Sequence, residues 1–90
     1  MWWRITVRYF GRVQGVGFRW QVREVARKHE CTGYARNLPD GSVELLVEGK
    51  YEVCRRMVGE VDGRMKKFWL EKKEDARVGE AHFNEFSIRR

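Results

Sequence analysis

A glycine-punctuated segment near the N-terminus has the residue types of an oxyanion-binding loop. It reads Gly-Arg-Val-Gln-Gly-Val-Gly-Phe-Arg over residues 11–19. Glycine tolerates positive φ angles, so such a backbone can approach a ligand closely and aim successive N–H groups at one anion. The helix expected to follow adds the positive end of its dipole, and Arg19 adds a planar fork of donors that suits a phosphate group. The segment therefore predicts a phosphate-binding site.

Two common nucleotide-binding folds do not match this segment. Its glycines are spaced Gly-x3-Gly-x-Gly, and the Gly-Lys-Ser/Thr of a mononucleotide P-loop does not follow. A chain of 90 residues is also too short for a doubly wound dinucleotide domain, which is built from repeated strand–helix–strand units. Both nucleotide interpretations are therefore disfavoured.

The composition indicates one domain over residues 1–90 with a single modest core. Hydrophobic residues make up 42% of the chain and aromatic residues 13%. The 19 Lys and Arg residues exceed the 13 Asp and Glu residues, and the formal net charge of +6 favours anionic partners. Phosphorylated metabolites and nucleic acids both meet that condition.

The sequence favours a cytoplasmic location. Its apolar runs fall short of the roughly 20 residues of a membrane helix, and the N-terminus lacks the pattern of a secretory signal, so no membrane partner is expected. Cys31 and Cys54 are far apart, without Cys-x-x-Cys spacing or a nearby pair of histidines. Two reduced thiols are favoured over a metal or redox site, with a single disulfide as the alternative. His29 and His82 are expected at surface or edge positions.

The hydrophobic period changes from that of a strand to that of a helix across the loop. Residues 3–9 alternate between apolar and polar side chains, which indicates a strand with one buried face. Apolar residues then recur at helical spacing at Phe18, Val22, Val25 and Ala26. The loop is therefore placed between a strand and the first turn of a helix.

The remaining elements complete an α+β pattern. Strands are predicted over 33–37 and 43–49 around a turn at 38–41, and a helix follows whose apolar stripe ends at Asp62-Gly63. A strand over 67–71, a turn or irregular connection over 72–80 and a closing strand over 83–88 are expected next. The order predicts a ferredoxin-like α/β sandwich, βαββαβ with a possible fifth strand, in which an antiparallel sheet carries two helices on one face.

Two segments of the chain together resemble the signatures of the acylphosphatase family. The first is residues 11–19. The second is residues 33–44, which read Gly-Tyr-Ala-Arg-Asn-Leu-Pro-Asp-Gly-Ser-Val-Glu. Their order and separation also match the family. The resemblance is close from about Ile5 to Gly49 and looser to Ile88, and the segment 61–65 lacks the glycine-proline-proline that such proteins usually carry after the second helix.

The resemblance implies hydrolysis of the carboxyl–phosphate bond of acyl phosphates to a carboxylate and inorganic phosphate, with no cofactor and no metal. It assigns the catalytic roles to Arg19 and Asn37, of which Asn37 orients the attacking water. Arg19 also binds the phosphoryl group, together with the backbone N–H groups of Gln14, Gly15, Val16, Gly17 and Phe18. The expected partner is a small acyl phosphate, nucleic acid is not expected, and the protein is expected to be a monomer.

Other interpretations of these residues stay open at this point. Taken alone, Arg19 is typical of a solvated helix surface, and Asn37 is typical of a turn residue that bonds nearby backbone. Four tryptophans and the positive charge allow a nucleic-acid-binding module, although no segment matches an RNP1 motif and Trp3 and Trp69 fit buried strand positions. A third alternative is a detached relative of the acylphosphatase-like domain of hydrogenase-maturation carbamoyltransferases, which would act on carbamoyl phosphate.

Overall fold

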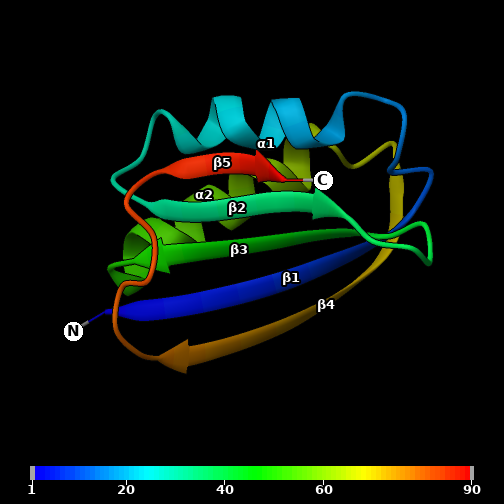
Figure 1. Cartoon of the computed structure of the whole chain (residues 1–90). Coiled ribbons are helices and arrows are strands. Elements are labelled where there is room, and N and C mark those ends of the chain that lie inside the picture. Colours follow the sequence, from blue (N-terminus) through cyan, green and yellow to red (C-terminus); the bar gives the residue numbers. More distant parts are fainter. Residues whose placement is uncertain (1, 90) are drawn as a thin grey trace.

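The computed structural model describes residues 2–89, and within them the chain forms five strands and two helices (Figure 1). Residues 1 and 90, the ends of the expected domain, lie outside the described part. The ferredoxin-like α+β architecture expected from the sequence is confirmed. The elements in chain order are β1 (Trp3–Gly11), α1 (Phe18–Ala26), β2 (Thr32–Asn37), β3 (Val43–Gly49), α2 (Tyr51–Arg64), β4 (Trp69–Val78) and β5 (Phe86–Arg89).

The sheet is mixed, which corrects the expectation of a wholly antiparallel one. Its strand order is β4-β1-β3-β2-β5. The pairs β1–β3, β1–β4 and β2–β3 are antiparallel, whereas β5 lies parallel to β2 with Gly33 opposite Phe86 and Arg36 opposite Arg89. The parallel pair arises because the chain leaves β4 at one edge, crosses the sheet and enters β5 at the other edge (Figure 1).

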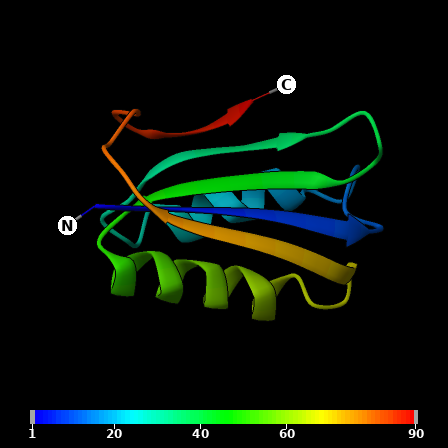
Figure 2. The ribbon, with the colours of Figure 1, turned by 90° about the horizontal axis from the view of Figure 1, so that it is seen from below.

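Both helices cover one face of the sheet and form the core with it. Figure 2 shows α2 along this face, and α1 packs against α2, β2 and β5. The apolar stripe predicted for α1 is buried in full. The strand side chains that meet the helices lie at alternate positions of β1 and β3. They are Ile5, Val7 and Tyr9 of β1 and Val43, Leu45 and Val47 of β3.

Strand β4 is longer than the sequence predicts. The expected strand over 67–71 and irregular connection over 72–80 are wrong, because a single strand runs from Trp69 to Val78. Its side chains are mostly exposed, so it has no apolar alternation to detect. The strand is held by its pairing to β1, from Trp3 opposite Val78 to Phe10 opposite Glu71. Charged side chains on such an edge also hinder pairing with other chains.

Helix α2 and strand β5 also differ from their expected bounds. The helix does not end at Asp62-Gly63 but continues to Arg64, and the Met65 N–H still bonds the Val61 carbonyl at 2.9 Å. Asp62 contributes to packing instead, since its carboxylate accepts from the Tyr9 hydroxyl at 2.8 Å. The closing strand is shorter than the predicted 83–88 and starts at Phe86.

Two further observations concern membrane-spanning helices and the two cysteines. No helix within residues 2–89 is long and apolar enough to cross a membrane. Cys31 and Cys54 are free thiols. Burial raises the pKa of Cys31 to about 12 and that of Cys54 to about 11, so both thiols are protonated and weakly nucleophilic at neutral pH.

A buried carboxylate anchors the connection between β4 and β5. Glu48, fully buried on the sheet face away from the helices, accepts hydrogen bonds from the backbone N–H groups of His82 at 3.0 Å and Phe83 at 3.1 Å. Arg4 forms an ion pair with it at 3.2 Å, and the Thr32 hydroxyl donates to it at 3.3 Å. The carboxylate therefore fixes the segment that carries the chain across the open face.

Replacing this carboxylate by an amide is expected to destabilise the protein. Glu48→Gln removes the charge that pairs with Arg4 and turns an NH2 group toward backbone donors. A broken buried ion pair with unsatisfied donors costs about 3 kcal/mol in the free energy of unfolding. Urea unfolding measures this cost, with the same change at exposed Glu30 as the matched control. Equal unfolding free energies for both variants would contradict the anchoring role.

Candidate active site at the end of the sheet

The loop between β1 and α1 contains two glycines in the left-handed region. Gly15 and Gly17 both have φ of 76°, and a Cβ at either position would meet nothing within 4 Å. The requirement for glycine is therefore one of backbone conformation rather than of space, since a side chain in this region costs roughly 1–2 kcal/mol. Gly17 is also the N-cap residue of α1 and provides no side-chain cap.

The backbone donors of this loop find no acceptors among the described residues. Within residues 2–89, no hydrogen-bond acceptor is found for the N–H groups from Gly15 to Trp20, while the Gly17 carbonyl accepts from the Gln21 N–H at 3.0 Å. The first N–H groups of a helix carry the positive end of its dipole. The loop and the first turn of α1 thus present a row of donors to solvent, an arrangement that suits an oxyanion.

The side chain of Gln14 joins this loop to the turn between β2 and β3. Its Nε2 donates to the Leu38 carbonyl at 2.8 Å and to the Ser42 carbonyl at 2.9 Å. The turn is itself braced by Asp40, which accepts from the Ser42 N–H at 2.9 Å. The hydrogen bonds from Ser42 lower the pKa of the Asp40 carboxyl group, so it stays ionised and continues to accept. The loop is therefore positioned against the end of β2.

Arg19, in the first turn of α1, is held by the C-terminal strand. Its Nη1 donates to the Arg89 carbonyl at 2.9 Å, and its side chain is half-buried. No carboxylate in the described part of the chain pairs with this guanidinium. A guanidinium has five N–H donors, so most of them remain available to a ligand. This arrangement differs from that of a solvated arginine on a helix surface.

Asn37 is the last residue of β2 and is paired in register with Val43. Its side chain is half-buried and makes no hydrogen bond with any residue in the range 2–89. A turn-forming asparagine would bond nearby backbone, and this one does not. Its amide is therefore available to bind water or a ligand. Because Arg36, the preceding residue, lies opposite Arg89, Asn37 and the contact made by Arg19 lie at the same end of the sheet.

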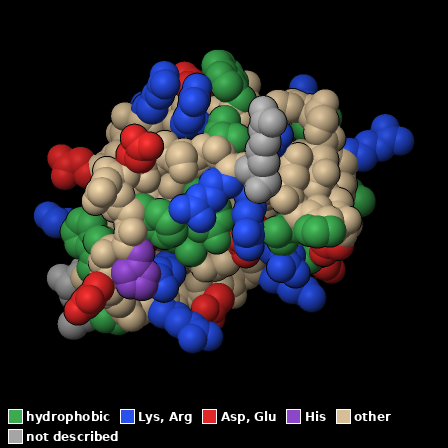
Figure 3. Space-filling model, in the orientation of Figure 1, with side chains coloured by type: hydrophobic (Ala, Val, Ile, Leu, Met, Phe, Trp, Pro, Cys, Tyr) green, Lys and Arg blue, Asp and Glu red, His purple; other side chains and the backbone are tan. Residues whose placement is uncertain are grey.

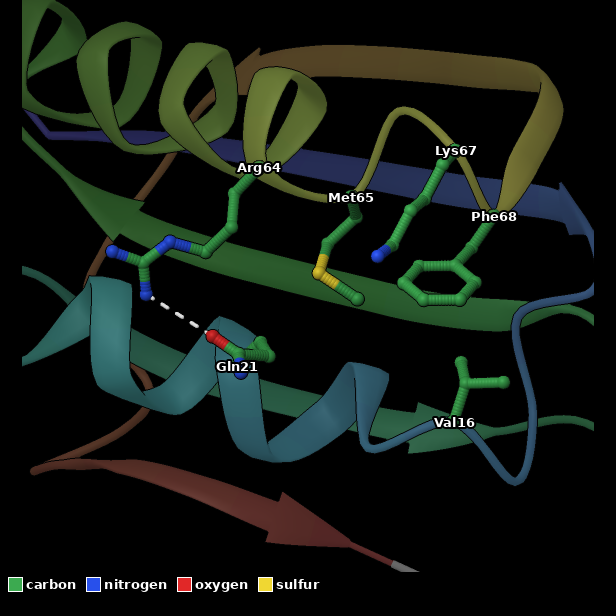
Figure 4. A pocket seen from close by; sticks show the side chains of 6 residues that line it. All are labelled: Val16, Gln21, Arg64, Met65, Lys67 and Phe68. Carbon is green, nitrogen blue, oxygen red and sulfur yellow. Dashed lines mark hydrogen bonds between the residues drawn. The ribbon is translucent and has the colours of Figure 1, made fainter.

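A cavity of about 300 Å³ adjoins the loop at Val16, between α1 and the connection from α2 to β4 (Figure 4). Neither Arg19 nor Asn37 lines it. The Val16 side chain points into it, facing Phe68 across the opening (Figure 4). The lining residues are Val16, Gln21, Arg64, Met65, Lys67 and Phe68.

The structure thus brings the predicted residues of the loop, Arg19 and Asn37 to one end of the sheet, and adds contacts that sequence reasoning missed. The Gln14 side chain, predicted only for its N–H group, bridges two loops. The Arg89 carbonyl and the cavity residues were also missed, because their proximity depends on how separate elements pack and no local motif marks it. The Nε2 atom of His29 lies 3.2 Å from a carboxylate oxygen of Glu60. No cluster of three or more metal-ligating side chains occurs within residues 2–89.

Comparisons with known proteins bear on the family and the fold. The family model "Acylphosphatase" matches residues 5–88. A curated acylphosphatase from Mycobacterium sp. (strain JLS) is 47% identical over 60 residues, which span 67% of this chain and 64% of that protein. One from Thermococcus kodakarensis is 50% identical over 56 residues, which span 62% of each chain. Each match thus covers less than two thirds of the relative's length. The crystal structure of acylphosphatase from Bacillus subtilis has a TM-score of 0.85 at 28% identity, covering 98% of this chain and 99% of that one.

Proposed function

Because this chain belongs to the acylphosphatase family, we propose that it hydrolyses acyl phosphates to a carboxylate and inorganic phosphate. The observation that carries the proposal is the row of backbone donors from Gly15 to Phe18, directly before Arg19, for which the described part of the chain provides no acceptors. These groups are suited to a phosphoryl group bearing three oxygens. The enzyme is proposed to be a single domain that needs no metal or organic cofactor.

In the proposed complex, the loop N–H groups of residues 14–18 and the Arg19 guanidinium bind the phosphoryl oxygens. Charge on these oxygens in the transition state is best stabilised by donors already in position, because no reorganisation is then needed during the reaction. The Arg89 carbonyl holds one edge of the guanidinium and leaves the opposite donors for phosphate. Gln14 contributes its N–H group to the ligand and its side chain to the position of the loop.

Asn37 is proposed to orient the attacking water. Its carbonyl oxygen accepts a hydrogen from water, and its NH2 group is a donor to another partner. The water oxygen forms a bond to phosphorus while the bond from phosphorus to the acyl oxygen breaks, and the electron pair of that bond leaves with the carboxylate. The proton of the water passes to a phosphate oxygen. Because a carboxylate is a good leaving group, positioning and charge stabilisation suffice without a strong general base.

We propose a small metabolite rather than a nucleic acid as the partner. Stacking of bases requires exposed aromatic rings on the open sheet face. Tyr34 on this face is only 8% exposed. The centre of its ring lies 5.5 Å from that of Phe83, in an edge-on arrangement, and the Arg89 guanidinium lies over it at 4.5 Å. Trp20 is 50% exposed but belongs to α1. Lys and Arg side chains do gather on the open face (Figure 3), which favours the approach of small anions as well.

We propose that the chain is a monomer and that it acts in the cytoplasm. Two free thiols at Cys31 and Cys54 are compatible with a reducing compartment. Sedimentation equilibrium of the purified chain tests the oligomeric state, and fractionation of the source cells tests the location.

The direct test of the proposed function is release of phosphate from benzoyl phosphate in the presence of a chelator. The unmodified chain is expected to turn over at the same rate with and without chelator, because the positive charge at the site comes from Arg19 and backbone dipoles. Inorganic phosphate, the product, is expected to inhibit competitively. A folded chain that releases no phosphate above the uncatalysed rate would refute the proposal for this class of substrate. Loss of activity on chelation would refute the metal-free mechanism.

A further inference from the structure

We propose that the cavity beside the loop binds the acyl group of the substrate and selects acyl groups that carry a second negative charge. This inference rests on the proposed function, since it concerns the part of an acyl phosphate that leaves as the carboxylate. The residues that determine the selection are Lys67 and, to a lesser extent, Arg64.

The position of Val16 connects the cavity to the phosphate-binding donors. Val16 lies between Gly15 and Gly17, the two residues whose conformation exposes those donors. Its N–H group belongs to the row without acceptors, whereas its side chain points into the cavity (Figure 4). A phosphoryl group on the loop thus lies beside the cavity, and an acyl group projecting from it on this side contacts Val16.

The floor of the cavity is apolar and of limited size. Met65 is 2% exposed, and Phe68 is half-buried with its ring turned toward the opening (Figure 4). With Val16 they form a surface suited to a hydrocarbon chain or a single aromatic ring. The volume of about 300 Å³ lies at the lower end of the range for small-molecule sites. A compact acyl group is therefore favoured over a long fatty acyl chain.

Two cationic side chains border this apolar floor, and they differ in how they are engaged. Arg64 donates through Nη1 to the Gln21 side-chain oxygen at 3.2 Å, and its Nη2 lies 3.5 Å from a Glu60 carboxylate oxygen. The Lys67 ammonium lies 5.1 Å from the centre of the Phe68 ring. No carboxylate within residues 2–89 forms an ion pair with Lys67.

A ligand carboxylate would therefore pair with Lys67 without displacing an acidic side chain. At Arg64 it would compete with Glu60. The apolar floor, the Lys67 ammonium without an ion-pair partner in the described part of the chain, and the loop at Val16 together match an acyl phosphate whose acyl group ends in a carboxylate or another anion. An uncharged acyl group would fill the same space without the ion pair.

Binding of two acyl phosphonates tests this inference without requiring turnover. Benzoylphosphonate and 4-carboxybenzoylphosphonate contain a carbon–phosphorus bond in place of the anhydride and differ by one carboxylate. Isothermal titration calorimetry at fixed ionic strength is expected to show about 5-fold tighter binding of the carboxylated probe to the unmodified chain, the upper end for a partly exposed ion pair. In Lys67→Met this preference is expected to disappear.

Lys66→Met is the matched control, because Lys66 is an exposed neighbour that does not line the cavity and carries the same charge. It is expected to retain the preference. Equal affinity of the two probes for the unmodified chain, or equal loss of the preference in both variants, would overturn the inference.

The two proposals fail in distinguishable ways. If benzoyl phosphate is not hydrolysed but the carboxylated phosphonate still binds more tightly through Lys67, the proposed function is refuted and the anion-selective cavity stands. If benzoyl phosphate is hydrolysed and the two phosphonates bind equally, the anion-selective cavity is refuted and the proposed function stands. If the chain is active, the ratio of kcat/KM for 4-carboxybenzoyl phosphate to that for benzoyl phosphate is expected to exceed one in the unmodified chain and in Lys66→Met. In Lys67→Met this preference is expected to disappear.

Discussion

The Arg19→Gln protein is expected to hydrolyse benzoyl phosphate with a kcat/KM about 10³-fold lower than that of the unmodified chain. The guanidinium is the one full positive charge that the proposed site places on the phosphoryl group, and it has no carboxylate partner among the described residues to weaken it. Inorganic phosphate is expected to inhibit this variant more weakly as well. Steady-state kinetics with phosphate as the inhibitor measure both effects.

A lysine at this position separates a catalytic from a structural role. Arg19 donates to the Arg89 carbonyl, so its loss also removes a contact that holds β5. An ammonium could still make that single bond, but it cannot present two parallel donors to a phosphate. Arg19→Lys is therefore expected to fold and to remain inactive. Recovery of activity in Arg19→Lys would identify Arg19 as a structural residue.

The matched control for charge is Arg27→Gln. Arg27 lies at the other end of α1, where it pairs with Glu24 at 3.3 Å, and its loss changes the net charge by the same amount. Activity is expected to stay within about 2-fold, because an exposed pair one helix length from the loop adds little at ordinary ionic strength. A large loss in this variant would indicate that overall charge, rather than the site, governs the rate.

The Asn37→Ala protein is expected to lose about 10²- to 10³-fold in kcat with little change in its inhibition by phosphate. Asn37 is proposed to orient water and not to hold the phosphoryl group, so its removal lowers the turnover step selectively. Because its side chain makes no hydrogen bond within residues 2–89, the free energy of unfolding is expected to change little. Kinetics and urea unfolding of the same preparation check both statements.

Asn84→Ala provides the matched control, since Asn84 is exposed in the connection before β5. It is expected to be fully active. An unchanged kcat in Asn37→Ala would remove Asn37 from the mechanism. A parallel loss of kcat and of stability would indicate that Asn37 supports the turn rather than the water.

The parts of the fold that the sequence predicts are those in which an element buries one face. The alternation in β1 and β3 and the stripe of α1 reflect contact with the core, so Ile5, Val22 and Leu45 are correctly placed. The extent of β4 could not be predicted in this way, because β4 is an edge strand held by backbone pairing to β1. The parallel direction of β5 could not be predicted either, since the direction of a strand depends on how its connection crosses the sheet and not on the local hydrophobic pattern.

The candidate site likewise contains residues that the sequence predicts and residues that it does not. The loop, Arg19 and Asn37 are visible as motifs because each lies in a short segment with distinctive residues. The link from Gln14 to the Leu38 carbonyl is invisible in the sequence, since a glutamine in a loop has many possible partners. Lys67 is likewise one of several lysines in a charged stretch. Only its place beside Phe68 and opposite Val16 makes it a candidate for specificity.

Strand β5 has a consequence for motion as well as for structure. It is four residues long, joins the sheet through β2 alone and reaches its place by the connection that Glu48 anchors. Short edge strands that pair with one neighbour open more readily than the rest of a domain. When β5 is open, Arg19 lacks the carbonyl that orients it while the core stays folded. In the proposed mechanism, the fraction of molecules with a correctly held Arg19 would follow the docking equilibrium of β5, at temperatures well below the melting of the whole domain.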